Sequence, residues 1–311
     1  MKRLLIHLGY PKAASTTLQN GLFYELHKSN VINFVARAME SGYFGSAQNK
    51  KEYKAWFRSV LQGRNVAETS NINEGIILNF SDKRLNVLSE GYFLTNEKHD
   101  SLFTIPEKVN DYFKDKVDKI ELLFVLRNQQ TLIMSDYVQT YCKIKEKSFL
   151  EYLNNRITSK KKKKFKIFYP YNLIRRYSEV IGKENIHIVF FEDLINDKET
   201  FSSELGAILG VRDDLVGKLL ESAYFNRTPK EEQGSVVRKL GPLSFGGRLR
   251  RIFDRIRLLM GGSIAPDRRI LVPNITDDEK LLIFNTFKDS NSKLAEEFGL
   301  DKERMKKYGY I

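Results

Sequence analysis

Cysteine, proline and long apolar runs are all scarce in this sequence. Cys142 is the 1 cysteine among 311 residues, which excludes an intramolecular disulfide and a cysteine-held zinc site. No window approaches the run of about 18 apolar residues that a membrane-spanning helix needs. The apolar stretch at the N-terminus is short and is interrupted by His7 and Pro11, which argues against a signal peptide. The simplest expectation is a cytoplasmic protein in a reducing compartment.

Internal repeats and flexible linkers are missing as well. The 7 prolines are too few to mark a boundary, and the one low-complexity stretch is the lysine run Lys160–Lys164. A content of 41% hydrophobic and 29% charged residues is ordinary for a globular protein. We therefore expect a single domain over residues 1–311, with a helical, variable C-terminal part from about residue 223.

Negative charge is also in short supply, because the formal net charge is +13. This excess favours an anionic ligand or partner, and nucleic acid, acidic lipid and a phosphorylated cofactor all remain open. The run Lys160–Lys164 is typical of a solvated loop. Residues 248–260 predict an amphipathic helix with arginines around an apolar face, which can lie on an anionic membrane but more often packs on its own domain.

Apolar runs of strand length alternate with segments of helical periodicity. The predicted strands are Arg3–Leu8, Asn86–Ser89, Ile120–Leu126 and Ile186–Phe191. One predicted helix follows the first loop, and three more cover Gln130–Lys143, Tyr171–Ile181 and Asp277–Phe298. Gly182 is expected to end the helix over Tyr171–Ile181. Strands that are apolar throughout indicate a parallel sheet covered on both faces, so we predict a three-layer α/β fold. Ligands of such sheets bind beyond the carboxyl ends of the strands.

The loop GYPKAASTT, from Gly9 to Thr17, lies between the first predicted strand and the first predicted helix. Backbone N–H groups and the positive end of the helix dipole converge at such a point, which suits an anion. Small and hydroxyl-bearing residues let the backbone approach a phosphate and supply donors: Ala13, Ala14, Ser15, Thr16 and Thr17. A plain turn with a Ser/Thr helix cap is the alternative, but it leaves Lys12 without a role.

The loop differs from that of nucleoside triphosphatases, G-x-x-x-x-G-K-[ST]. Aligned on Gly9, it has Ala14 in the second glycine position and Ser15 in the lysine position. The strand that begins at Ile120 is followed by Arg127, where a magnesium-binding aspartate would be expected. These differences argue against a P-loop nucleotide kinase, which we keep as an alternative beside a noncatalytic module that binds anions or membranes.

Two motifs together resemble those of the sulfotransferase superfamily. Residues 11–16, PKAAST, resemble its loop P-K-x-G-[ST]-[ST], with alanine in place of glycine, and LIHLGYPKAASTTLQ is similar to the bacterial branch. In FVLRNQQTLIMSDY, Arg127 and Ser135 match the second signature, an arginine at a strand end with a serine eight residues later. YSEVIGKENIHIVFFEDL and SNSKLAEEFGLD extend the resemblance weakly over most of the chain.

The resemblance implies a P-loop-like sulfotransferase fold and an enzyme that uses 3'-phosphoadenosine 5'-phosphosulfate (PAPS) as donor and releases 3'-phosphoadenosine 5'-phosphate (PAP), without a required metal. It implies that the first loop holds the 5'-phosphate and that Lys12 stabilises charge on the leaving phosphate. It also implies that Arg127 and Ser135 hold the 3'-phosphate, and a guanidinium at a strand end can indeed fork onto phosphate oxygens.

The remaining site residues are expected from position within the resemblance. Glu90, after the strand NVLS, is the favoured general base for the acceptor, and His99 is the reserve candidate. A late basic loop often closes over the nucleotide in this family, and the loop over residues 226–239 offers Arg227 and Arg238. The adjacent acidic residues Glu192 and Asp193 are expected to cap or brace the segment that follows.

The acceptor cannot be derived from motifs. A hydroxyl or amine is required by the chemistry, and the bacterial resemblance favours a glycan or polysaccharide hydroxyl, with a lipid or a small metabolite left open. We expect no nucleic-acid partner, and peripheral contact with an anionic membrane stays open because of the basic segments.

Overall fold

The computed structural model describes residues 1–10, 12–35, 56–57, 59–60, 79–90, 104–140, 148–158, 168–222, 236–238, 269–271 and 274–311. The chain divides into two compact units. The first comprises Met1–Leu132, Lys161–Asn226 and Phe284–Ile311, and the second comprises Ile133–Lys160 and Arg227–Ile283. Within the described ranges, no helix combines the length and the apolar character needed to cross a membrane.

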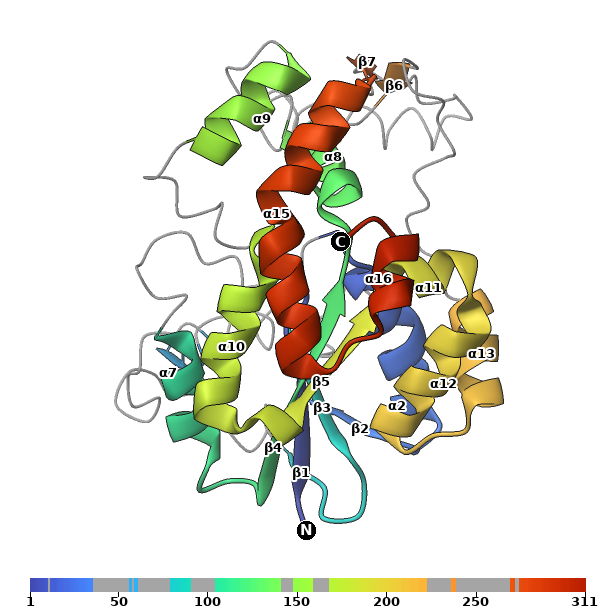
Figure 1. The fold of residues 1–311 in the computed structure, drawn as a ribbon. Coiled ribbons are helices and arrows are strands. Elements are labelled where there is room, and N and C mark those ends of the chain that lie inside the picture. Colours follow the sequence, from blue (N-terminus) through green and yellow to red (C-terminus); the bar gives the residue numbers. More distant parts are fainter. Residues whose placement is uncertain are drawn as a thin grey trace, which may run out of the picture. The chain divides into compact units, whose positions relative to one another are not determined.

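A parallel sheet of five strands forms the centre of the first unit, in the order β2-β3-β1-β4-β5 (Figure 1). The strands are β1 (Arg3–His7), β2 (Asn33–Val35), β3 (Asn86–Ser89), β4 (Lys119–Leu126) and β5 (Ile186–Phe190). The central strand β1 pairs with β3, where His7 lies opposite Ser89, and with β4, where His7 lies opposite Leu123. Because all pairings are parallel, the carboxyl ends of β3, β1 and β4 lie at one edge of the sheet.

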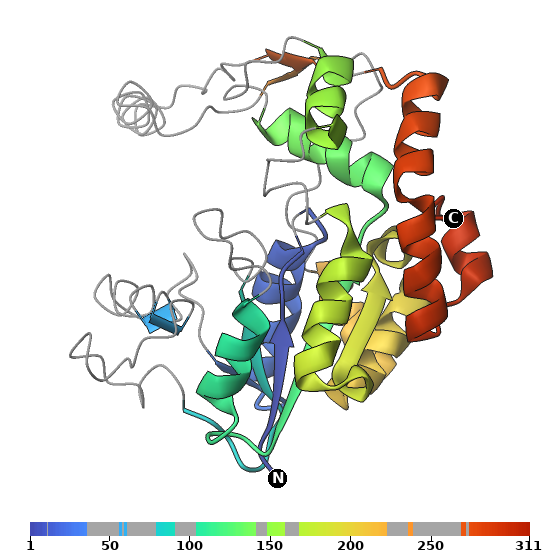
Figure 2. The ribbon, with the colours of Figure 1, turned by 60° about the vertical axis from the view of Figure 1, so that its left-hand side comes forward.

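Helices cover both faces of this sheet, which completes the predicted three-layer α/β architecture (Figure 2). On one face, α7 (Ile105–Phe113) contacts α10 (Pro170–Ile181). On the other, η1 (Leu18–Phe23) contacts α13 (Asp213–Ser222), which packs on α12 (Lys198–Leu209). Since both faces are covered, strand residues of β1, β3 and β4 are buried almost without exception.

The remaining elements complete the two units. In the first unit they are α1 (Ser15–Thr17), α2 (Tyr24–Lys28), η5 (Lys183–Asn185), α11 (Phe191–Asn196) and α16 (Lys302–Lys307). Two helices begin in one unit and end in the other: α8 (Gln129–Thr140) and α15 (Asp277–Phe298). In the second unit, α9 (Phe149–Thr158) is accompanied by the antiparallel pair β6 (Val236–Arg238) and β7 (Arg269–Leu271).

The predicted elements agree with the structure to within one or two residues where both are described. Gly182 ends α10 with φ 93°, a conformation that glycine adopts easily. The helix predicted over Gln130–Lys143 is observed as α8 to Thr140, and its last three residues lie outside the described ranges. The short strand β2 and the helices α7, α9, α12, α13 and α16 have no counterpart among the predictions.

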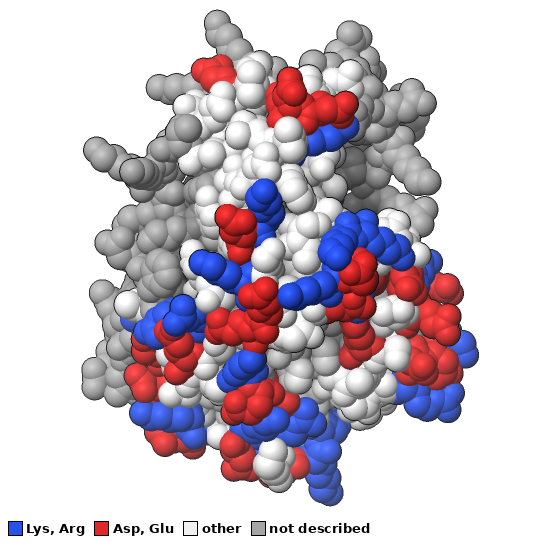
Figure 3. All heavy atoms as spheres, viewed as in Figure 1, with Lys and Arg blue, Asp and Glu red and all other residues white. Residues whose placement is uncertain are grey.

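Basic and acidic side chains are interspersed over the face of the first unit drawn in Figure 3. Several form pairs, such as Lys302 with Glu296 at 3.3 Å and Lys306 with Glu303 at 2.7 Å. The basic segments that raised a membrane partner, Lys160–Lys164 and the helix predicted over 248–260, lie outside the described residues.

Candidate active site

The loop after β1 has an unusual backbone. Gly9, Lys12 and Ala14 have φ angles of 55°, 62° and 57°. Non-glycine residues rarely adopt positive φ, and such strain tends to be retained at functional sites. Ala14 is the residue immediately before α1, so the strained turn leads directly into the positive end of the first helical segment.

The backbone carbonyl of Tyr10 accepts the hydrogen bonds that close this loop. The backbone N–H of Ala13 and the hydroxyl of Ser15 both donate to the Tyr10 carbonyl, each at 3.3 Å. Tyr10 itself is buried, and burial raises the pKa of its hydroxyl far above the ordinary value, so it stays neutral. Beyond the turn, Thr16 is exposed and Thr17 is buried. The loop is therefore a compact turn closed by its own hydrogen bonds.

Arg127 follows β4 and reaches across to this loop. Its Nη1 donates to the carbonyl oxygen of Lys12 at 2.6 Å, and its Nε donates to Oγ1 of Thr131 at 3.0 Å. The guanidinium carbon lies 4.5 Å from the ring centre of Phe191. A guanidinium has five N–H donors, of which described residues accept two. The structure thus brings the side chain of Arg127 into contact with the backbone of Lys12.

Arg127 is half-buried. Burial lowers its pKa from the ordinary value, while the charge of Glu192 acts to raise it. Because the ordinary pKa of arginine is so high, the side chain remains a cation at any physiological pH. A partly desolvated cation at a sheet edge suits an anionic ligand.

Glu90 follows β3 and lies beside the strand that leads into the loop. It is 3% exposed, and its backbone N–H donates to the carbonyl of His7 at 3.1 Å. The preceding Ser89 is held by two further groups, since Nε2 of Gln19 donates to its Oγ at 2.8 Å and Nδ1 of His7 lies 2.7 Å from the same oxygen. The carboxylate of Glu90 therefore starts from a rigid backbone at the same edge of the sheet.

The other predicted site residues are placed only in part. Ser135 lies half-buried on α8 in the second unit. Arg238 is the last residue of β6, and nothing is described of its side chain. His99 and Arg227 lie outside the described residues. The described ranges contain no group of three His, Cys, Asp or Glu side chains that could hold a metal ion.

Sequence reasoning missed the polar residues that support Arg127 from behind. The backbone N–H of Asn128 donates to Glu192 at 2.8 Å, and the hydroxyl of Tyr310 donates to the other oxygen of that carboxylate at 2.9 Å. Glu192 and Asp193 are predicted to cap or brace the segment that follows them. Both lie in the first turn of α11, but their side chains contact other segments: Asn128 and Tyr310 for Glu192, and Arg304 and Tyr308 for Asp193. No periodicity or motif marks Asn128 or Tyr310 in the sequence. The only available signal was that Asn128 directly follows Arg127.

The comparisons with known proteins bear on the fold. No family model matches the sequence. No curated protein matches it either. Among solved structures, a sulfotransferase from Alicyclobacillus acidocaldarius has a TM-score of 0.51 and 14% identity and covers 96% of this chain and 96% of its own. The sulfotransferase domain of the Synechococcus PCC 7002 olefin synthase has a TM-score of 0.38 and 14% identity, covering 72% of this chain and 78% of its own. The sulfotransferase domain from the curacin biosynthetic pathway has a TM-score of 0.34 and 10% identity, covering 85% of this chain and 99% of its own.

Proposed function

We propose that this chain, which has the sulfotransferase fold, is a PAPS-dependent sulfotransferase that transfers a sulfuryl group to a hydroxyl or amine. The observation that carries the proposal is the pairing of the strained loop after β1 with Arg127 after β4. One site edge therefore offers a helix N-terminus for one anionic group and a guanidinium for another. PAPS has two separated phosphate positions, whereas a nucleoside triphosphate has a single chain of phosphates.

The residues present fit such a donor. The loop residues Lys12 to Thr17 would hold the 5'-phosphate through backbone N–H groups and hydroxyls. Arg127 would hold the 3'-phosphate with the donors that the described residues leave over, and Ser135 is proposed as its partner on α8. Arg227 and Arg238, from the segment after α13, are proposed as further contacts to the nucleotide.

The proposed step transfers sulfur in line and needs charge stabilisation more than covalent catalysis. The acceptor oxygen forms a bond to sulfur while the bond from sulfur to the 5'-phosphate oxygen breaks. Glu90 takes the proton of the acceptor, and PAP leaves with the electron pair and one added negative charge. The ammonium of Lys12 is assigned to that charge, a role in which one donor contributes a few kcal/mol.

Glu90 suits the role of base because of where its backbone is held. The hydrogen bond from its N–H to His7 ties it to the strand that enters the phosphate loop. His7 and Gln19 both contact Oγ of Ser89, the residue before Glu90. The backbone that carries the Glu90 carboxylate is therefore held by a buried cluster of hydrogen bonds. His99 is the alternative base.

The acceptor we propose is a carbohydrate hydroxyl, on the strength of the bacterial resemblance of the loop. This is the finest level of the proposal and is separate from the donor. A panel of polysaccharides, a lipid hydroxyl and a simple phenol, incubated with the protein and radiolabelled PAPS, would assign the acceptor by which product carries the label.

The donor is tested by thermal unfolding in the presence of PAP, ATP with magnesium, or buffer alone. A ligand that binds only the folded state adds about 2.7 kcal/mol at 100 times its dissociation constant. We expect a rise in the unfolding temperature with PAP and little change with ATP. Stabilisation by ATP alone would favour the nucleotide kinase. No response to either, together with salt-sensitive binding to anionic vesicles, would favour the noncatalytic module.

A further inference from the structure

The last residues of the chain return to the end of β4. Helix α16 is followed by a turn in which the N–H of Gly309 donates to the carbonyl of Lys306 at 2.9 Å and the N–H of Tyr310 to that of Met305 at 2.9 Å. Gly309 takes φ 73°, which favours glycine at this point of the turn. Residues 308–310, called the chain end below, include Tyr310, which is 1% exposed. Burial of this kind requires specific contacts with the rest of the protein.

Asn128, the residue after Arg127, makes two of these contacts. Its side-chain Nδ2 donates to the carbonyls of Tyr308 at 3.0 Å and Gly309 at 2.8 Å. Its Oδ1 accepts from the N–H of Gln130 at 2.9 Å and so caps the start of α8. The side chain of Asn128 therefore ties the chain end to the turn that carries Arg127.

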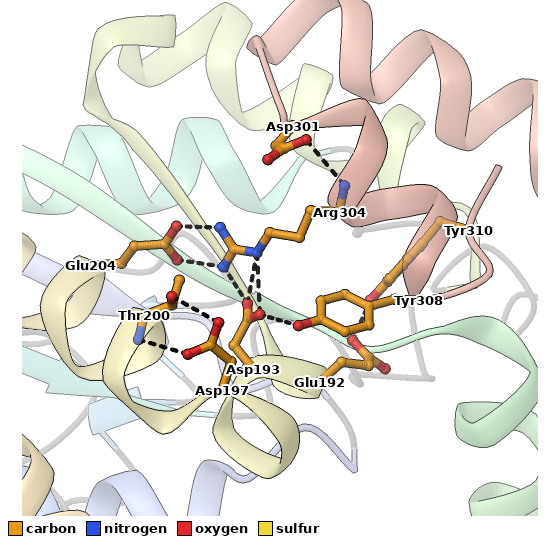
Figure 4. Close-up of polar contacts among 9 residues, drawn as sticks. All are labelled: Glu192, Asp193, Asp197, Thr200, Glu204, Asp301, Arg304, Tyr308 and Tyr310. Atoms are coloured by element: carbon orange, nitrogen blue, oxygen red, sulfur yellow. Dashed lines mark hydrogen bonds and ion pairs between the residues drawn. The ribbon is translucent and has the colours of Figure 1, made fainter.

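Glu192 connects the same turn to the ring of Tyr310. One carboxylate oxygen accepts from the backbone N–H of Asn128 at 2.8 Å, and the other accepts from the hydroxyl of Tyr310 at 2.9 Å. Figure 4 shows Tyr310, from the chain end, and Glu192, from α11, pointing toward each other. Burial raises the pKa of Glu192 and of Tyr310, because each charged form would lose solvation. The Tyr310 hydroxyl thus supplies one of the hydrogen bonds that satisfy the buried carboxylate of Glu192.

Neighbouring contacts hold the chain end in this place. Arg304 pairs with Asp193 and with Glu204, and the hydroxyl of Tyr308 donates to Asp193 (Figure 4). The amide of Asn291 donates to the carbonyl of Tyr310 at 2.9 Å and exchanges hydrogen bonds with Gln129. These contacts attach the chain end to α11, α12 and α15, and leave the hydroxyl of Tyr310 to serve Glu192.

A continuous path of contacts then leads from the chain end to the phosphate loop. It runs from the Tyr310 hydroxyl to Glu192, from Glu192 to the Asn128 N–H, and through the backbone to Arg127. Arg127 in turn donates to the carbonyl of Lys12. The charge of Glu192 also acts to raise the pKa of Arg127, which is consistent with this path.

We propose that Tyr310 and Glu192 are positioning residues for Arg127, so that the C-terminal end of the chain sets the geometry of the donor's 3'-phosphate subsite. The inference rests on the proposed function, because it takes Arg127 as the 3'-phosphate ligand. Neither residue touches the donor in this account. They act by holding the Arg127–Asn128 turn at a fixed place, and a small displacement of a guanidinium costs a bidentate phosphate contact.

The test separates the two phosphates of the ligand. The affinities of PAP and of adenosine 5'-monophosphate, which lacks the 3'-phosphate, are measured by calorimetry for wild type and for Tyr310→Phe. The phenyl ring keeps its packing against Phe190, whose ring centre lies 5.4 Å away, and only the hydroxyl is lost. We expect PAP affinity to fall roughly 5- to 30-fold, the effect of one hydrogen bond to a buried carboxylate. The monophosphate should lose less than about 2-fold, since the Arg127 contact to the loop is retained.

Two further variants guard against a general loss of structure. Tyr308→Phe removes a hydroxyl from the same chain end but from Asp193, so PAP affinity should stay within about 2-fold of wild type. Glu192→Ala should behave as Tyr310→Phe does. Glu192→Gln keeps an acceptor for Asn128 and an amide for the tyrosine oxygen, and we expect it to restore PAP affinity to within roughly 3-fold of wild type.

The outcomes are distinct. If wild type fails to bind PAP, the proposed function is overturned and the inference with it. If wild type binds PAP and the Tyr310 and Glu192 variants do so equally well, only the inference is overturned. The positioning role would be rejected if Tyr310→Phe lost affinity for PAP and for the monophosphate equally. It would also be rejected if Tyr308→Phe and Tyr310→Phe lost affinity for PAP equally, because the chain end would then contribute only to packing.

Discussion

Nη1 of Arg127 donates a hydrogen bond of 2.6 Å to the carbonyl oxygen of Lys12. The two residues are 115 positions apart in sequence, and each is proposed to serve a different phosphate subsite of the donor. This hydrogen bond would then join the two subsites. Losing it should weaken the binding at both.

Arg127→Lys tests this coupling. A lysine carries the charge but lacks the planar fork that reaches Lys12 and Thr131 while facing a phosphate. We expect the affinity for PAP to fall roughly 10- to 100-fold, and the affinity for adenosine 5'-monophosphate to fall as well, because the loop loses its tie. Calorimetric titration measures both. Arg175→Lys, an exposed change on α10, is the matched control, and a loss confined to PAP would show that the subsites are independent.

Lys12→Ala tests charge stabilisation in the transfer step. Turnover at saturating PAPS should fall about 10²- to 10³-fold, the usual cost of removing one donor aimed at developing charge. PAP binding should fall less, since the loop backbone remains. The exposed change Lys28→Ala serves as control. Nearly full turnover in the Lys12 variant would remove this residue from the chemistry.

Glu90→Gln tests the base. The amide has the same size and keeps the backbone bond to His7, so PAP should bind as to wild type. Transfer should fall about 10²- to 10⁴-fold, because no carboxylate accepts the acceptor's proton. The comparison is of kcat in the variant and in the exposed control Glu199→Gln. Unchanged kinetics would transfer the role to another group, with His99 next in line.

The backbone strain of the loop predicts opposite effects at two adjacent alanines. Ala14 has φ 57°, so Ala14→Gly should raise the free energy of unfolding by up to about 1 kcal/mol. Ala13 is fully buried, and Ala13→Gly should lower it by about 1 kcal/mol through the lost methyl group and the added chain entropy. Urea unfolding measures both, and destabilisation by Ala14→Gly would contradict the strain. The sulfotransferase loop that this sequence resembles has glycine where this chain has Ala14, which fits that backbone angle.

Glu121 predicts an acid-sensitive contribution to stability at the opposite end of the sheet. Burial acts to raise the pKa of this carboxyl, but hydrogen bonds from His187, Arg3 and Lys119 outweigh burial and hold the pKa well below its usual range. The stabilisation is therefore present above the unfolded-state pKa of about 4.3 and lost as pH falls below it.

Glu121→Gln measures that contribution. We expect the variant to be less stable than wild type by about 1–3 kcal/mol near pH 7, because its partners lose a charged acceptor. The difference should shrink as pH is lowered below about 4, where wild type begins to be protonated on unfolding. A difference that stays constant down to pH 2 in urea titrations would exclude this linkage.

The sequence predicts the parts of this protein that depend on local pattern. The strands β1, β4 and β5 are largely apolar runs, and the parallel sheet that they indicate predicts that the residues after them, such as Lys12 and Arg127, lie at one edge. The strand β2 has only three residues, Asn33–Val35, too few to establish a period. Short elements of this kind depend on the neighbour they pair with.

The support behind Arg127 could not have been predicted in the same way. Tyr310 and Glu192 are 118 residues apart, and Asn128 and Gly309 are 181 apart. Each is an ordinary polar or aromatic residue in its own segment, with no spacing that singles it out. Their significance arises from the fold, which brings the chain end to α11 and the start of α8.

The docking of Tyr310 has a consequence for folding. Its hydroxyl meets Glu192 across 118 residues of chain, so the contact closes a long loop and depends on the segments between them having folded. In the positioning role proposed above, the support for Arg127 is therefore gained only when residues 308–310 have docked.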